Sequence, residues 1–81
     1  MNDTLGWIYY KKNLPEQALP LLEESVRSDP NNALHQYHLG MTYLRAGDWN
    51  KARPPLERAL KLNPDFGAAV EAKNALVMIG G

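Results

Sequence analysis

The feature that most constrains the fold of this chain is an internal repeat of 34 residues. Shifting the sequence by 34 positions superimposes identical residues at six pairs of positions: Leu5 and Leu39, Gly6 and Gly40, Tyr9 and Tyr43, Ala18 and Ala52, Leu22 and Leu56, and Pro30 and Pro64. Chance does not align a Leu-Gly pair, a tyrosine three residues later and a distant proline in one register. A fixed period of this length is typical of repeat architectures, in which similar units stack on one another.

The residues of the repeat carry a resemblance to a known family. The second copy reads Leu39, Gly40, Tyr43, Ala52, Leu56, Ala59 and Pro64, and the first reads Leu5, Gly6, Tyr9, Ala18, Leu22, Ser25 and Pro30. This spacing resembles the tetratricopeptide repeat (TPR), with its pattern W-x2-L-G-x2-Y, A-x3-F and P. The turn 46–49, "AGDW", also matches the Gly-Asp-aromatic junction of that family. The resemblance covers residues 1–66.

The chain departs from the family pattern at two places. Gln36 and Asn2 stand where the first tryptophan is expected, and the first copy has Asn13-Leu14 with Pro15 in place of the Gly-Asp-aromatic turn. The resemblance still implies an all-α fold, a right-handed superhelical array (an α-solenoid) of two helical hairpins with a C-terminal capping helix. The implied division is a first repeat over 1–32, a second over 33–66 and a capping helix over 67–81.

Local signals predict five helices, near residues 2–12, 15–28, 32–46, 49–62 and 66–79. Pro15 suits a first helical turn, and the expected N-caps of later helices are Asn31 or Asn32, Asp48 and Asp65. Three prolines, Pro20, Pro54 and Pro55, fall inside predicted helices. Because proline removes a backbone hydrogen bond there, we expect a bend or a loosened first turn rather than separate helices.

The two repeat glycines are expected at helix crossings. A glycine costs a helix about 0.5–1 kcal/mol relative to alanine, and close packing of two backbones offsets that cost. Ala18 and Ala52 are the small residues expected to face Gly6 and Gly40. The residues expected to form the core within each repeat are Leu5, Tyr9, Leu39 and Tyr43.

The last predicted helix is not a third repeat, because Lys73-Asn74 occupies the place of Leu-Gly. Its residues Ala69, Ala72, Leu76 and Ile79 have the spacing of one apolar helix face. Polar residues lie off that stripe, as a terminal cap of a repeat array requires. This segment is therefore expected to cover the second hairpin.

Composition excludes several classes of protein. The chain has no cysteine, so it holds neither a disulfide framework nor a thiolate zinc site, and its formal net charge is zero. A neutral chain is a poor candidate for binding nucleic acid by neutralising phosphates. An RNA-binding helical repeat stays an alternative with little support, since only Lys11, Lys12 and Arg45 could form a basic strip. No segment looks like a membrane span or a signal peptide, which makes the cytoplasm the default expectation.

Catalytic chemistry finds little support in the sequence. His35 and His38 are three residues apart and could touch one metal ion, but no convincing third ligand lies near them on that helix. The pair Glu23-Glu24 is better explained as a solvated helix face than as an acid–base pair, and Ser25 falls in a slot for a small core residue. We therefore expect no enzyme activity, no cofactor and no metal.

What remains is a surface. In TPR arrays the first helix of each hairpin lines the concave side, where partners usually bind, and this is an implication of the resemblance. The residues expected in that groove are Trp7, Tyr10, Lys11, Leu34, Tyr37, His38, Met41, Leu44 and Arg45. The groove is apolar and aromatic with a basic rim, so a largely apolar peptide or helix fits it better than an acidic tail.

Two functions follow from that surface. The first is a non-catalytic protein-interaction module, which could form the C-terminal part of a longer TPR protein. The alternative is a structural, self-assembling unit whose groove is filled by its own copies, most simply as a two-fold symmetric dimer. Neither hypothesis involves a membrane or nucleic acid.

Overall fold

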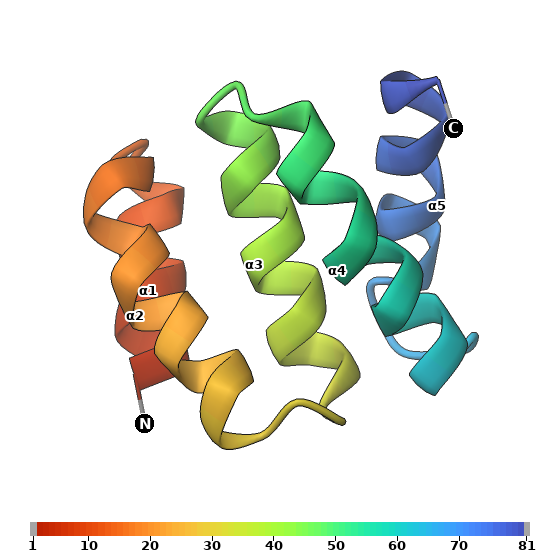
Figure 1. Cartoon of the computed structure of the whole chain (residues 1–81), viewed down its shortest axis with the longest axis horizontal. Helices are drawn as coiled ribbons and strands as arrows, with labels where there is room; N and C mark the ends of the chain where they lie inside the picture. The colour runs from red at the N-terminus through yellow and green to blue at the C-terminus, as the bar shows by residue number, and fades with distance from the viewer. Residues whose placement is uncertain (1, 81) are drawn as a thin grey trace.

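The computed structural model describes residues 2–80, and it folds them into five helices joined by short turns (Figure 1). The helices are α1 (Asn2–Lys11), α2 (Pro15–Ser28), α3 (Ala33–Arg45), α4 (Trp49–Leu62) and α5 (Ala69–Ile79). The prediction of an all-α chain with five helices is confirmed. Helices α2 and α4 run unbroken through their internal prolines, as single helices.

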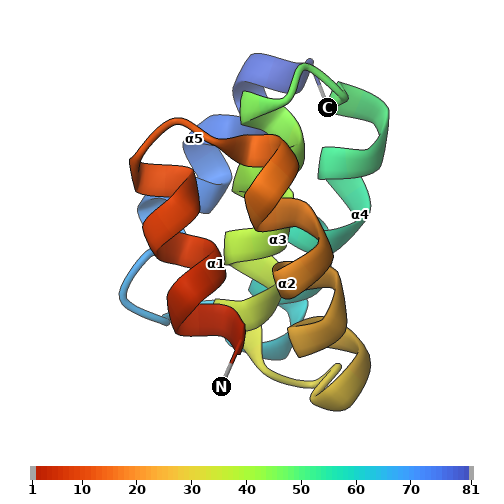
Figure 2. The same cartoon turned by 90° about the vertical axis from the view of Figure 1, so that its left-hand side faces the viewer.

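The helices pack in chain order as two hairpins followed by a fifth helix. α1 packs on α2 and α3 packs on α4, and the two helices of a hairpin run in opposite directions (Figure 1). α3 contacts all four of the other helices. Figure 2 shows α1 and α5 toward one side of α3 and α4 toward the other. The first helices of the repeats therefore share one side of the molecule.

The two hairpin turns have the same backbone although their sequences differ. Asn13 and Gly47, which are 34 residues apart, both have positive φ, at 63° and 87°. In each turn the next residue donates its N–H to the carbonyl of the repeat tyrosine, from Leu14 to Tyr9 at 2.9 Å and from Asp48 to Tyr43 at 3.0 Å. Asparagine replaces glycine here because its short polar side chain tolerates the left-handed region.

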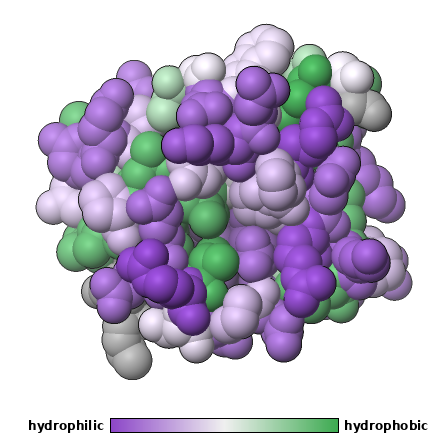
Figure 3. All heavy atoms as spheres, in the orientation of Figure 1, coloured by the Kyte–Doolittle hydropathy of each residue, from purple (hydrophilic) through white to green (hydrophobic). Residues whose placement is uncertain are grey.

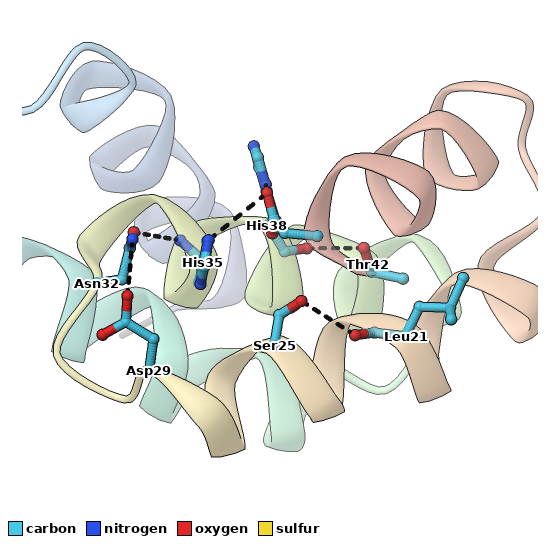
Figure 4. A network of polar contacts seen from close by, with 8 residues as sticks. Leu21, Ser25, Asp29, Asn32, His35, His38 and Thr42 are labelled. Atoms are coloured by element: carbon cyan, nitrogen blue, oxygen red, sulfur yellow. Dashed lines mark hydrogen bonds and ion pairs between the residues drawn. The ribbon is translucent and has the colours of Figure 1, made fainter. Parts of the chain in front are cut away.

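Helix capping follows the prediction at two of the three helix starts for which it was made. Asn32 accepts a hydrogen bond from the N–H of His35 at 3.1 Å (Figure 4), and Asp48 accepts one from the N–H of Lys51 at 3.2 Å. Each bond satisfies a donor that would otherwise be unpaired in the first turn. Leu14 stands at the position of Asp48 in the first hairpin, and α2 has no side-chain cap.

The start of the last helix is a correction. The helix begins at Ala69 rather than at residue 66, and Asp65 does not cap it. Instead the side chain of Asn63 accepts a hydrogen bond from the N–H of Asp65 at 3.1 Å, which holds the chain in a turn after Pro64. The expected apolar stripe is confirmed: Ala69 and Ala72 are buried, and Leu76 and Ile79 pack against the core of the second hairpin.

The glycines lie at the predicted helix crossings. A Cβ atom built on Gly40 would lie 2.6 Å from Cγ of Leu56, and one on Gly6 would lie 2.7 Å from Cγ of Leu22. Leucines therefore fill the space that the absent side chains leave, whereas Ala52 presents its backbone oxygen to Gly40, at 3.2 Å from the built Cβ. This close approach explains why glycine is retained inside both helices.

The core prediction is wrong for Leu5, whose side chain is 46% exposed. Its equivalent in the second repeat, Leu39, is buried because it packs against Ala18 and Leu22 of α2, the second helix of the preceding hairpin. The leucine position therefore seals the junction between repeats rather than the inside of one repeat. Within residues 2–80 no helix lies on that side of α1, so Leu5 has no equivalent cover.

Candidate protein-interaction face

A row of stacked side chains crosses from α1 to α3. The guanidinium of Arg45 lies 4.3 Å from the centre of the Tyr10 ring. Tyr10 stacks on Trp7 with 4.2 Å between ring centroids and an interplanar angle of 3°, and Trp7 stacks on His38 at 3.9 Å and 17°. We call these four residues the stacked row. It joins the two first helices by cation–π and ring-stacking contacts.

Asp3 extends the stacked row at its buried end. Both of its carboxylate oxygens lie 2.9 Å from Nδ1 of His38, so the imidazole N–H donates to the carboxylate. Nε2 of His35 lies 4.0 Å from the same carboxylate. Asp3 and His38 are buried, and a hydrogen-bonded pair is the arrangement in which buried polar groups are tolerated. Nδ1 of His35 is buried without a hydrogen-bond partner.

Helical spacing explains how the sequence builds this row. Asp3, Trp7 and Tyr10 are separated by four and three residues, so they lie on one face of α1. His38 and Arg45 are seven residues apart on α3, which places them on one face two turns apart. The two faces meet because α1 and α3 are neighbours in the array.

The structure places the predicted groove residues at different depths. The side chains of Trp7, Tyr10, Met41 and Leu44 are half-buried, those of Lys11 and Arg45 are exposed, and that of Leu34 is 46% exposed. Tyr37 and His38 are buried instead, with 8% and 6% exposure. Trp7, Met41 and Leu44 all pack against the core cluster that contains Tyr37. The predicted residues are thus brought together, with Tyr37 and His38 beneath the others.

Tyr37 is held among aromatic rings from three parts of the chain. Its ring lies 5.8 Å from that of Trp7 and 5.7 Å from that of Phe66, which meets it edge-on. Burial, with smaller contributions from Glu71 and Tyr10, raises the pKa of the Tyr37 hydroxyl above its usual value. Phe66 belongs to the turn before α5, so this contact links the second repeat to the last helix.

A second tyrosine links the hairpins on the opposite side of α3. The hydroxyl of Tyr43 donates a hydrogen bond to the carboxylate of Glu23 on α2. Burial, the hydrogen bond to Glu23, and the negative charges of Glu23 and Asp48 raise the pKa of Tyr43 to about 12. Glu23 is therefore a partner of the repeat tyrosine, a role that its sequence neighbourhood, Glu23-Glu24, does not reveal.

Sequence reasoning missed Asp3 as a partner of the histidines. The contact spans 35 residues, and no local pattern announces it. The signal that could have found it is the repeat itself, because Asp3 is the groove position of the first copy that corresponds to Tyr37. An acidic residue at a position that is aromatic in the other copy calls for a polar partner on the neighbouring helix.

The chemistry available at this face is that of contact rather than of catalysis. The hydroxyls of Ser25 and Thr42 donate to backbone carbonyls one turn earlier in their own helices (Figure 4). Among the residues that the structure describes, no group of three or more histidine or acidic side chains could hold a metal ion. Each helix within 2–80 falls short of the length and apolar character needed to cross a bilayer.

Comparison with known proteins agrees with this architecture. The tetratricopeptide repeat family model matches residues 4–65 and, in a second register, residues 37–73. The chain belongs to the tetratricopeptide repeat family. TPR units are generally scaffolds for protein–protein interaction, so the α1/α3/α5 side of this TPR chain is the natural place to look for a partner surface.

A distant relative shares the TPR repeats. The chain is 37% identical over 60 residues to the probable UDP-N-acetylglucosamine–peptide N-acetylglucosaminyltransferase SPINDLY of Hordeum vulgare. The match covers 74% of this TPR chain but spans only 6% of that protein's length. The transferase activity in the relative's name is therefore not assigned to this chain.

Proposed function

We propose that this chain is a non-catalytic protein-interaction module that binds a largely apolar peptide or helix across α1, α3 and α5. We define the interaction face as the accessible apolar and aromatic residues of these helices: Trp7, Tyr10, Leu34, Met41, Leu44 and Met78. The observation that carries the proposal is the exposure of Leu34 and Met78, at 46% and 63%, beside the ordered stacked row. The family places this face on the concave side of the array.

The interaction face is suited to apolar partners because much of it is fixed before binding. Trp7 and Tyr10 are held by stacking and by Arg45, whose guanidinium also donates to the Tyr10 hydroxyl at 3.1 Å. Rigid aromatic side chains give large contact area at low entropy cost. Met41 and Met78 supply flexible apolar surface that adapts to an irregular partner.

The buried residues of the predicted groove have a supporting role in this proposal. Tyr37 and His38 are covered, so they hold Trp7 in place rather than contact a partner. The rim cations, Lys11 and Arg45, remain exposed and can pair with an acidic residue at one end of an apolar peptide.

The opposite side of the molecule offers less to an apolar partner. The side on which α2 and α4 face the viewer in Figure 1 is largely hydrophilic, with hydrophobic atoms gathered in a narrow strip near its middle (Figure 3). The accessible apolar residues Leu34 and Met78 belong to α3 and α5 instead. This contrast supports the α1/α3/α5 side as the partner site.

Selection from a library of amphipathic peptides, followed by calorimetric titration of one selected peptide, tests the proposal. Leu34→Glu and Met78→Glu place a charge on two accessible residues of the interaction face and are expected to raise Kd about tenfold or more. Trp49→Glu is the matched control, because Trp49 is 48% exposed on α4. Equal weakening by all three changes would contradict a partner site on this face.

A second candidate function is self-assembly, and exposed apolar residues at both ends of the array favour it. Leu5 and Ile8 of α1 are 46% and 44% exposed, and Val70 and Val77 of α5 are 64% and 77% exposed. Sedimentation over a concentration series separates the two functions. A monomer leaves the interaction face free for a partner, whereas a dimer that Leu34→Glu and Met78→Glu dissociate supports self-assembly through this face.

A further inference from the structure

The side of α1 that faces away from the array carries an apolar strip, and we call it the outer face of α1. It consists of Leu5, Ile8 and Tyr9, which lie within one helical turn of each other. Leu5 and Ile8 are 46% and 44% exposed. Tyr9 is half-buried, since its ring packs against the core cluster of the first hairpin. The strip is therefore continuous with an existing packed interface.

The internal repeat shows what covers this strip elsewhere in the same molecule. The equivalent positions 34 residues later are Leu39, Thr42 and Tyr43 on α3. Leu39 is 8% exposed, Thr42 is 0% exposed, and the Tyr43 ring packs into the same cluster as Leu39. The helix packed on α3 at this cluster is α2. The same three positions are thus covered in the second repeat by a helix that precedes them.

The chemistry of the covering helix can be read from α2. Ala18 and Leu22 lie against Leu39, and Leu19 and Val26 pack at the edge of the same cluster. Glu23, one residue after Leu22, accepts a hydrogen bond from the Tyr43 hydroxyl. The covering helix thus combines a small residue, a leucine four residues later and an acid facing the tyrosine.

We propose that the outer face of α1 is a docking site for an amphipathic helix with the pattern of α2. Such a helix would bury Leu5 and Ile8 and present an acidic side chain to the hydroxyl of Tyr9. Lys12, exposed and four residues after Ile8, adds a positive charge on that side that favours an acidic partner helix. This site is separate from the interaction face, so it stands or falls independently of the proposed function.

An extended chain tests the proposal in the correct register. Residues 13–35 are repeated ahead of Asn2 in place of Met1, which keeps the 34-residue spacing and presents a second copy of α2 to the outer face. Docking is expected to raise the thermal midpoint by about 4 °C or more. The matched control carries Asp in place of the leucine and valine that correspond to Leu22 and Val26, only in the added copy, and is expected to leave the midpoint unchanged.

A substitution on the docking face makes the test reciprocal. Ile8→Asp is expected to change the midpoint of the original chain little, because Ile8 is half-exposed there, and to lower that of the extended chain by several degrees. An equal effect of Ile8→Asp in both chains, or equal midpoints for the extension and its control, overturns the proposal. Sedimentation identifies the other occupant: an original chain that dimerises and becomes monomeric on Ile8→Asp shows that a second copy, not an α2-type helix, covers this face.

Discussion

Both carboxylate oxygens of Asp3 lie 2.9 Å from Nδ1 of His38, which ties the first turn of α1 to the middle of α3. The His38 ring in turn stacks on Trp7 at 3.9 Å between centroids. One buried polar pair therefore positions the aromatic residue at the centre of the interaction face. The geometry of that face depends on a contact between repeats rather than on either repeat alone.

Removing the Asp3 carboxylate is expected to destabilise the fold. Asp3→Ala leaves Nδ1 of the buried His38 without an acceptor, which costs about 1–3 kcal/mol of unfolding free energy. Asp3→Asn keeps one acceptor oxygen and is expected to cost less. Denaturant unfolding measures both, with Asp65→Ala as an exposed control that should lie within about 0.5 kcal/mol of the original chain. A neutral Asp3→Ala would show that the pair does not hold α1 to α3.

The helix crossing at Gly40 is expected to reject even one methyl group. A Cβ at this position would lie 2.6 Å from Leu56 Cγ and 3.2 Å from the Ala52 carbonyl, so Gly40→Ala forces the helices apart at a cost of about 1–3 kcal/mol. Gly67→Ala is the control, because a Cβ there meets nothing within 4 Å. Gly80 is not suitable as a control, since its φ of 87° penalises any side chain. Similar unfolding midpoints for Gly40→Ala and Gly67→Ala would contradict the crossing.

The uncapped start of α2 offers a stabilising change. Leu14→Asp would reproduce the cap that Asp48 provides in the second hairpin, and it is expected to raise the free energy of unfolding by about 1 kcal/mol. The reverse change, Asp48→Leu, is expected to lower it by a similar amount. Thermal unfolding of the two variants checks the pair, and a fall in stability with Leu14→Asp would mean that the apolar side chain matters more than the cap.

The stability of the fold is expected to decline at alkaline pH because of Tyr43. Its pKa is about 12 in the folded chain and 10.0 in the reference state, so the folded chain keeps this proton after the unfolded chain has lost it. The stabilising effect is complete below pH about 10 and disappears as pH rises to about 12. Tyr43→Phe should remove this part of the decline and leave a smaller one from Tyr37, whose pKa is also raised.

Glu23→Gln separates the causes of that shift. It removes the charge that disfavours tyrosinate, so an absorbance titration of the tyrosines should show Tyr43 ionising at a lower pH than in the original chain. Glu24→Gln is the matched control, because Glu24 is exposed and lies next in sequence. An unchanged titration with Glu23→Gln would assign the shift to burial alone.

The sequence predicted those parts of the fold that repeat. Gly6 and Gly40, the turn at Asn13 and the cap at Asp48 all recur at or near equivalent positions, so one copy explains the other. The start of α5 was wrong because Asn63 bonds the backbone after Pro64 and delays the helix, which a cap signal at Asp65 does not reveal.

The ends of the array and its polar contacts could not be read in the same way. Leu5 has the same residue type and register as Leu39, but its burial depends on a neighbouring helix rather than on its own repeat. Asp3–His38 and Tyr43–Glu23 join different hairpins, so their partners become clear only once the stacking of the helices is known. The groove residues were identified from the repeat register, whereas their depth depended on the stacked row.

The central claim is that the α1/α3/α5 side of this TPR unit binds an apolar peptide or helix. Amide chemical-shift mapping by NMR, during titration with a selected peptide, tests it most directly. The account predicts the largest shifts at Trp7, Leu34, Met41, Leu44 and Met78, with small shifts along α2 and on the exposed side of α4. Shifts concentrated on α2 and α4, with the stacked row unaffected, would contradict it.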